Sequence, residues 1–120
     1  MVDADPSVFA LFQEVAKGLD LKLRHAATPE EAWRLMDAHE PLAVFADYRQ
    51  RGEDGLSLLQ HVGQKLPLVK RILHTGEPLP SLPPGHDIPV LGIPCDITGL
   101  RDLLQTLADL ARPRSEAAPA

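Results

Sequence analysis

The sequence predicts an α/β domain built on a doubly wound parallel sheet. Apolar runs of strand length alternate with segments whose apolar residues recur at helical spacing, which is the order of successive βαβ units. The apolar run 42–46 leads directly into turn-rich sequence, and Asp47 stands at the junction. Such a run predicts a buried parallel strand that ends at the carboxyl edge of the sheet, where open α/β folds bind their ligands.

Length and composition suit a single soluble domain. The chain has 120 residues, 44% of them hydrophobic and 24% charged, and its net charge is -5. This charge provides no basic surface for nucleic acid or for a membrane. No apolar run approaches the roughly 20 residues that span a bilayer. Met1 is not followed by a basic leader, and Cys95 has no cysteine partner, so we expect a cytoplasmic protein. We assign 1–111 to the domain and 112–120 to a disordered tail.

The first third of the chain predicts two strands and a helix. Only two residues precede Asp3, so the first strand is expected to be very short; either this edge is truncated or upstream residues are missing from this chain. Asp5 followed by Pro6 is typical of a helix start, and Gly18 is a fitting stop. The leucines of 19–24 alternate with charged residues, which predicts a second strand.

Two further helices follow from their caps. Thr28 before Pro29 predicts a helix start, with Glu31 placed to complete a capping box, and Pro41 ends this helix. Asp54 opens a third helix. The apolar face of that helix consists of Leu56, Leu58, Leu59 and Val62.

The last third predicts two strands and one helix. The run 69–73 reads as a strand that ends at His74 and Thr75. The segment 77–87 is rich in proline, so a fourth helix is shortened or replaced by a loop. Residues 88–93 predict the last strand, and Thr98 is expected to cap a final helix. The apolar face of that helix consists of Leu100, Leu103, Leu104, Leu107 and Leu110.

Five short motifs follow one another along the chain. They are the acidic stretch 3–5, Asp47, Asp54-Gly55, Thr75-Gly76 and Ile93-Pro94. In this order and at these spacings, the chain resembles the receiver domain of two-component response regulators, a flavodoxin-like (βα)5 fold with a five-stranded sheet. The similarity covers 2–111. The run that begins at Asp47 resembles the receivers of hybrid sensor histidine kinases in particular.

The resemblance implies a role for each motif. Asp47 would be the phospho-acceptor, and Thr75 would be the switch hydroxyl that hydrogen-bonds the phosphoryl group. Mg²⁺ would be held by Asp3, by Asp47 and by the backbone carbonyl of Arg49, with Asp5 as a further candidate. Mg²⁺ suits such a site because it takes oxygen ligands. At most, the domain would catalyse its own phosphorylation on Asp47, and it would not otherwise be an enzyme.

Three departures from the family pattern predict a degenerate receiver. Ala4 stands where the family has its second acid, and Ile93 stands where it has lysine. The loss of one preorganised charge contact costs roughly 10²-fold or more in rate. The fourth-helix region is altered, and Val90 replaces the aromatic switch residue. Mg²⁺ binding is therefore doubtful.

These residues are compatible with three functions. The first is a pseudo-receiver that acts as a phospho-signalling or protein-interaction module and binds a histidine kinase, a phosphotransfer protein or an output protein. The second is a working receiver that a partner histidine kinase phosphorylates on Asp47. The third is an unrelated flavodoxin-like binding protein, although no Gly-rich phosphate loop follows a strand. None of these implies a nucleic-acid or membrane partner.

Other candidates have simpler interpretations. The five histidines fit no metal-ligand spacing, and His74, expected at the rim of the site, is assigned to packing. Arg49 and Arg51 are interpreted as solvated loop charges. The PxxP spacing of 80–83 fits a polyproline ligand, but a loop that closes the sheet is the better interpretation.

Overall fold

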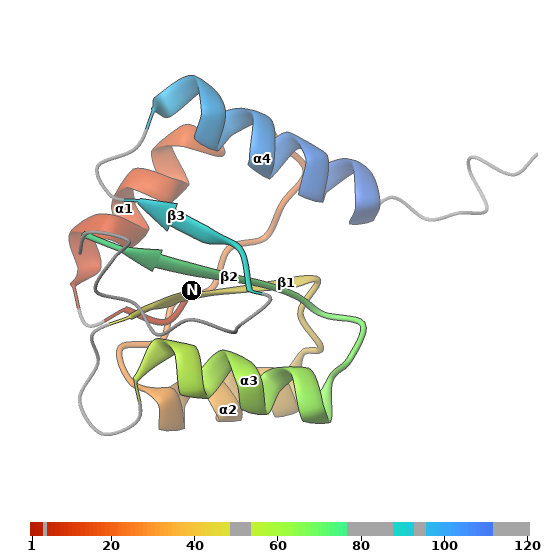
Figure 1. Cartoon of the computed structure of the whole chain (residues 1–120). Coiled ribbons are helices and arrows are strands. Elements are labelled where there is room, and N and C mark those ends of the chain that lie inside the picture. Colours follow the sequence, from red (N-terminus) through yellow and green to blue (C-terminus); the bar gives the residue numbers. More distant parts are fainter. Residues whose placement is uncertain (4, 49–53, 77–87, 93–95, 112–120) are drawn as a thin grey trace, which may run out of the picture.

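The computed structural model describes residues 1–3, 5–48, 54–76, 88–92 and 96–111 (Figure 1). Three strands form one parallel sheet in the order β1-β2-β3. The strands are β1 (Ala43–Asp47), β2 (Lys70–Thr75) and β3 (Val90–Gly92). The helices are α1 (Pro6–Val15), α2 (Pro29–Ala38), α3 (Gly55–Lys65) and α4 (Ile97–Ala111).

Two single-residue bridges extend the sheet beyond β1. Val2 bridges Ala46 of β1 on one side and Ala26 on the other, both in parallel. The spatial order is therefore the Ala26 segment, Val2, β1, β2 and β3, which is the doubly wound arrangement that the sequence predicts. The Val2 backbone donates to the Phe45 carbonyl at 2.7 Å and accepts from the Asp47 N–H at 2.9 Å.

The strand predicted over 19–24 is wrong. The described residues there have no strand pairing, and the contact with Val2 is made only at Ala26. A strand needs backbone pairing with a neighbour, and alternation of side chains alone does not provide it. Its leucines still serve the core, because Leu19, Leu21 and Leu23 pack against the buried cluster on the α1 side. The alternation correctly indicated a half-buried segment but not its hydrogen bonding.

A cavity of about 320 Å³ lies beside the reduced first strand. Its walls come from the segment before Ala26, from β1 and from the helices on both faces of the sheet. Its apolar lining includes Phe12, Leu21, Leu23, Leu35 and Leu104.

Helices cover both faces of the sheet (Figure 1). Helices α1 and α4 lie on one face, and α2 and α3 lie on the other. Strand β1 divides its side chains between them, because alternate residues of a strand point to opposite sides. Phe45 packs with α1 and α4, and meets Phe12 edge-on at a centroid distance of 5.1 Å. Val44 and Ala46 pack with α2 and α3.

Local sequence explains the helix starts. The side chains of Asp5, Thr28 and Asp54 each accept a backbone N–H from the first turn of their helix, as predicted. Glu31 accepts the N–H of Ala27 at 3.1 Å, so the predicted capping box closes one residue before the cap. The three cap side chains each satisfy an N–H that the helix itself leaves without an acceptor.

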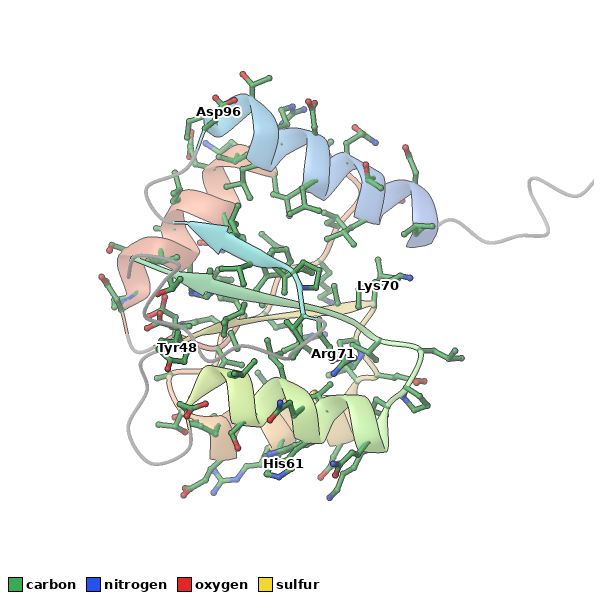
Figure 2. The ribbon with its side chains drawn as sticks, viewed as in Figure 1. Tyr48, His61, Lys70, Arg71 and Asp96 are labelled. Carbon is green, nitrogen blue, oxygen red and sulfur yellow. The ribbon has the colours of Figure 1, made fainter. Side chains whose placement is uncertain are left out.

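The predicted cap of the last helix is wrong. Helix α4 begins at Ile97, so Thr98 is already helical. The side chain of Asp96 accepts the Thr98 N–H at 3.3 Å, and Figure 2 shows Asp96 at the start of α4. Along α4, Leu100, Leu104 and Leu107 are buried as expected, whereas Leu110 is 56% exposed.

Several predictions lie outside the described residues. These are the proline-rich segment 77–87, the tail 112–120, and the positions of Ala4, Arg49 and Ile93. Val90 begins β3 and is half-buried. No helix in the described part of the chain has both the length and the apolar character that crossing a membrane requires.

Candidate functional site

The carboxyl ends of the strands gather the acidic and hydroxyl residues that the sequence singled out. Asp47 ends β1 and Thr75 ends β2, while Asp3 follows the Val2 bridge. Figure 2 shows Tyr48 at this end of the sheet and Lys70 at the opposite end. The Tyr48 N–H donates to the His74 carbonyl at 2.9 Å, so β1 and β2 stay paired up to this edge.

A cluster of two carboxylates and one imidazole lies at this edge. Asp3, Asp47 and His74 each offer one ligand atom, and these atoms lie within 4.8 Å of one another. The Cα atoms of Asp47 and His74 are partners in the β1–β2 register. Asp3 is 3% exposed and His74 is 1% exposed, whereas Asp47 is half-buried. The expectation that His74 lies at the rim of the site is therefore wrong.

Both carboxylate oxygens of Asp3 accept hydrogen bonds from within the domain. Oδ1 accepts the backbone N–H of Asp5 at 2.8 Å. Oδ2 lies 2.9 Å from Nε2 of His74. The Asp3 carbonyl lies 2.7 Å from Nε2 of His25, whose ring stacks on Phe9. Asp3 is thus held by three different segments of the chain.

Asp5 lies outside the cluster. Its side chain is exposed, and its Oδ1 accepts from the N–H of Ser7 at 2.9 Å and from the Ser7 hydroxyl at 2.7 Å. These hydrogen bonds lower the pKa of the Asp5 carboxyl, because they stabilise its charged form. Only the backbone of Asp5 reaches the cluster, through the N–H that it donates to Asp3.

Thr75 is the last residue of β2. It is 2% exposed, follows His74 at the end of β2, and is in register with Gly92 of β3. A buried hydroxyl therefore lies one residue from the strand partner of Asp47.

Comparison with solved structures identifies the fold. The signal receiver domain of an HD domain-containing protein from Pseudomonas fluorescens Pf-5 matches with a TM-score of 0.81 and 26% identity, over 97% of this chain and 88% of that chain. A two component transcriptional regulator AraC from Clostridium phytofermentans ISDg matches with a TM-score of 0.77 and 18% identity, over 98% of this chain and 95% of that chain. The chain has the fold of a response-regulator receiver domain. The predicted flavodoxin-like class is confirmed.

A further receiver domain has the same fold. The signal receiver domain of a signal transduction histidine kinase from Syntrophus aciditrophicus matches with a TM-score of 0.75 and 20% identity, over 92% of this chain and 89% of that chain. No family model matches the sequence. No curated protein matches it either.

Receivers use Mg²⁺ at an acidic pocket, so the donor set of this receiver fold decides whether the ion suits it. Mg²⁺ favours an octahedral shell of oxygens and keeps several of its waters. Here a buried imidazole adjoins Asp3, and an ion at Asp3 would compete with the N–H groups of Asp5 and His74. Imidazole is a ligand for Zn, Cu, Fe and Ni rather than for Mg²⁺. The cluster therefore fits Mg²⁺ poorly.

Burial sets the charge of His74. It lowers the pKa of His74, and the hydrogen bond and charge of Asp3 oppose this shift only in part. The imidazole is neutral at neutral pH, so its contact with Asp3 is a hydrogen bond to a carboxylate rather than a full ion pair. The sequence carried one signal for this role: a histidine that ends an apolar run directly before Thr75.

Proposed function

We propose that this receiver-fold domain is a two-component signalling module that works as a pseudo-receiver. It binds a histidine kinase, a phosphotransfer protein or an output protein in the cytoplasm, and it does not accept a phosphoryl group efficiently. The observation that carries this proposal is the hydrogen bonding of Asp3, whose two carboxylate oxygens are engaged by Asp5 and His74.

Phospho-acceptance depends on the charges that surround the phosphoryl group. Phosphoryl transfer to a carboxylate depends on positioning and on neutralising the phosphoryl oxygens, and metal ions supply much of that neutralisation. The described part of this site contains two carboxylates and a neutral imidazole, and this donor set fits Mg²⁺ poorly. Ile93 adds to the argument from sequence, because an apolar side chain replaces the lysine of the family pattern.

The second candidate is a working phospho-acceptor. Asp47 favours it, because this carboxylate ends β1 at the carboxyl edge and is only half-buried, so a phosphodonor can reach it. Thr75 also lies at the end of the neighbouring strand. Both residues carry the side chains that phospho-acceptance on Asp47 from a partner histidine kinase would use.

Intact mass after incubation with a small phosphodonor and Mg²⁺ separates the two. The pseudo-receiver predicts no phosphoryl adduct on the folded wild type, under conditions that fully modify an active receiver measured alongside. An adduct that is absent from Asp47→Asn and retained by Asp37→Asn, an exposed aspartate on α2, would establish the second candidate.

Partner binding tests the positive half of the proposal. Immobilised wild type and Asp47→Asn are each titrated with histidine kinases and phosphotransfer proteins from the same genome. A pseudo-receiver binds the same partner with equal affinity in both forms. Binding that requires a phosphodonor and is lost in Asp47→Asn contradicts it.

A further inference from the structure

His74 is a buried polar residue that none of the family roles uses. We infer that His74 excludes the divalent cation from this receiver fold, because its hydrogen bond to Asp3 organises the acidic pocket without a metal. This inference rests on the proposed function and gives it a residue-level cause. Three features of the molecule support it: the position of the ring, the nitrogen that carries the proton, and the hydrogen bonds of Asp3.

The position of the ring is fixed by the core. His74 belongs to β2, in register with Asp47, and is 1% exposed. Its ring lies 6.2 Å from the ring of Phe12 on α1. Strand pairing on one side and α1 on the other leave it little freedom, so Nε2 stays directed at Asp3, at 2.9 Å.

The second ring nitrogen identifies the tautomer. Nδ1 is buried, and within the described residues it has no hydrogen-bond partner. A proton on Nδ1 would be a buried donor without an acceptor, which costs about 1–3 kcal/mol. In the other neutral tautomer Nδ1 is an unpartnered acceptor, but Nε2 then carries the proton and donates it to the Asp3 carboxylate at 2.9 Å instead of setting its lone pair against that carboxylate. Nε2 therefore presents an N–H to Asp3, not a lone pair to a metal.

The same reasoning argues against His74 as a ligand. A metal-bound histidine donates its other N–H to a carboxylate, a carbonyl or a water. Were Nε2 to bind a metal, the Nδ1 proton would need such an acceptor, and no described residue supplies one. The acidic cluster thus resembles a metal site in composition, but its imidazole is in the wrong tautomer for one.

Asp3 gains from His74 what a metal would otherwise provide. A carboxylate that accepts several N–H groups is stable in its charged form without an ion. Asp3 accepts one N–H from the Asp5 backbone and one from His74, while only 3% exposed. Mg²⁺ sheds its water reluctantly, so entry beside an already satisfied and buried carboxylate is unfavourable.

The test uses Mn²⁺ as a paramagnetic probe of the site in the full chain. Broadening of the Asp3 and Tyr48 amide signals is followed by NMR in wild type, His74→Leu and His74→Gln. Wild type is expected to show no site-specific broadening. His74→Leu removes the donor and is expected to raise the affinity for Mn²⁺ about tenfold or more, the scale on which residues that contact metal ligands change metal affinity. His74→Gln keeps an N–H donor and is expected to stay metal-free.

His61→Leu is the matched control, because His61 lies on the outer face of α3, away from the sheet (Figure 2). If His74→Leu does not fold, His74→Val provides a second apolar replacement. Wild-type binding that is lost in His74→Leu would show His74 to be a ligand and overturn the inference. Absence of binding in both wild type and the apolar variant would overturn it too, because another feature would then exclude the ion.

The outcome is separable from that of the proposed function. A phosphoryl adduct on Asp47 in a wild type that binds no Mn²⁺ would refute the pseudo-receiver and leave the role of His74 intact. Absence of an adduct in a wild type that binds Mn²⁺ would support the pseudo-receiver and refute the role of His74.

Discussion

Nε2 of His74 and Oδ2 of Asp3 form a buried hydrogen bond of 2.9 Å between residues 71 positions apart. The bond joins β2 to the residue that follows the Val2 bridge, across the intervening β1. It places an imidazole inside the acidic edge of a receiver fold. The following predictions concern this bond and the elements that hold it.

The Asp3–His74 bond is expected to behave asymmetrically in mutagenesis. Asp3→Ala leaves the His74 N–H buried without an acceptor and is expected to destabilise the domain by about 1–3 kcal/mol. The double variant Asp3→Ala/His74→Leu should recover part of this loss, because neither partner is then left unsatisfied. Urea unfolding of the two single variants and the double variant measures the coupling. Additive losses would contradict a direct bond, and Asp37→Ala on α2 serves as the surface control.

Stability is expected to fall in mild acid because of His74. The pKa of His74 is lowered from 6.5 in the folded state. Below about pH 6.5 the unfolded chain takes up a proton that the folded one does not, so the unfolded state is favoured as the pH decreases. The contribution of His74 should be level above this range and decrease below it, down to the folded pKa. Urea unfolding between about pH 7.5 and pH 5 measures this, and His74→Gln should reduce the slope below about pH 6.5, whereas the Met1 amino group, whose pKa burial lowers to about 6, titrates in both proteins. An equal slope in both proteins would assign the effect to other groups.

Two glycine-to-alanine changes are expected to act in opposite directions. A Cβ at Gly55 would overlap the carbonyl of Asp47, whereas a Cβ at Gly99 meets only Asp96 atoms at 3.6 Å and 3.9 Å. Gly55→Ala should therefore cost about 1–3 kcal/mol, since the start of α3 and the end of β1 must separate. Gly99→Ala should stabilise α4 by about 0.5–1 kcal/mol. Thermal unfolding of both variants tests this, and a neutral Gly55→Ala would show that the loop adjusts freely.

Arg101 is expected to connect α4 to the end of α1. Its Nη1 donates to the carbonyl of Val15 at 2.7 Å and to the carbonyl of Lys17 at 3.0 Å. These carbonyls lie at and just after the end of α1, where the helix itself supplies no N–H donor. Arg101→Met keeps the stem and removes these bonds, so a loss of about 1 kcal/mol is expected. Arg34→Met, at an exposed position of α2, should change the free energy of unfolding little. Equal effects of the two changes in urea unfolding would mean that the α1–α4 contact depends on apolar packing alone.

Features set by neighbouring residues were predictable, and features set by distant partners were not. Asp5, Thr28 and Asp54 cap helices through contacts within three residues, so their side-chain type was sufficient evidence. Asp96 was missed in favour of Thr98 because both residues are good caps and lie two positions apart. The segment 19–24 had the alternation of a strand, but a strand also needs a neighbour of matching length, which the segment itself does not reveal.

The candidate site follows the same division. Asp47 and Thr75 could be placed at the carboxyl edge because each ends an apolar run, and parallel strands end at a common edge. The burial of His74 and its bond to Asp3 depend on the register of β2 against β1. That register is a tertiary property, so the sequence favoured packing for a histidine at the end of an apolar run.

The reduced first strand has a consequence for how the sheet opens. The central strand of a doubly wound sheet is normally among the slowest regions to exchange its amide hydrogens, because it is flanked on both sides. Here its backbone is held around Val2 by four backbone hydrogen bonds, which involve Phe45, Asp47 and Ala26, with a cavity alongside. The Val2 and Asp3 amides should therefore exchange faster than those of β2, and the sheet should lose its order from the middle outward.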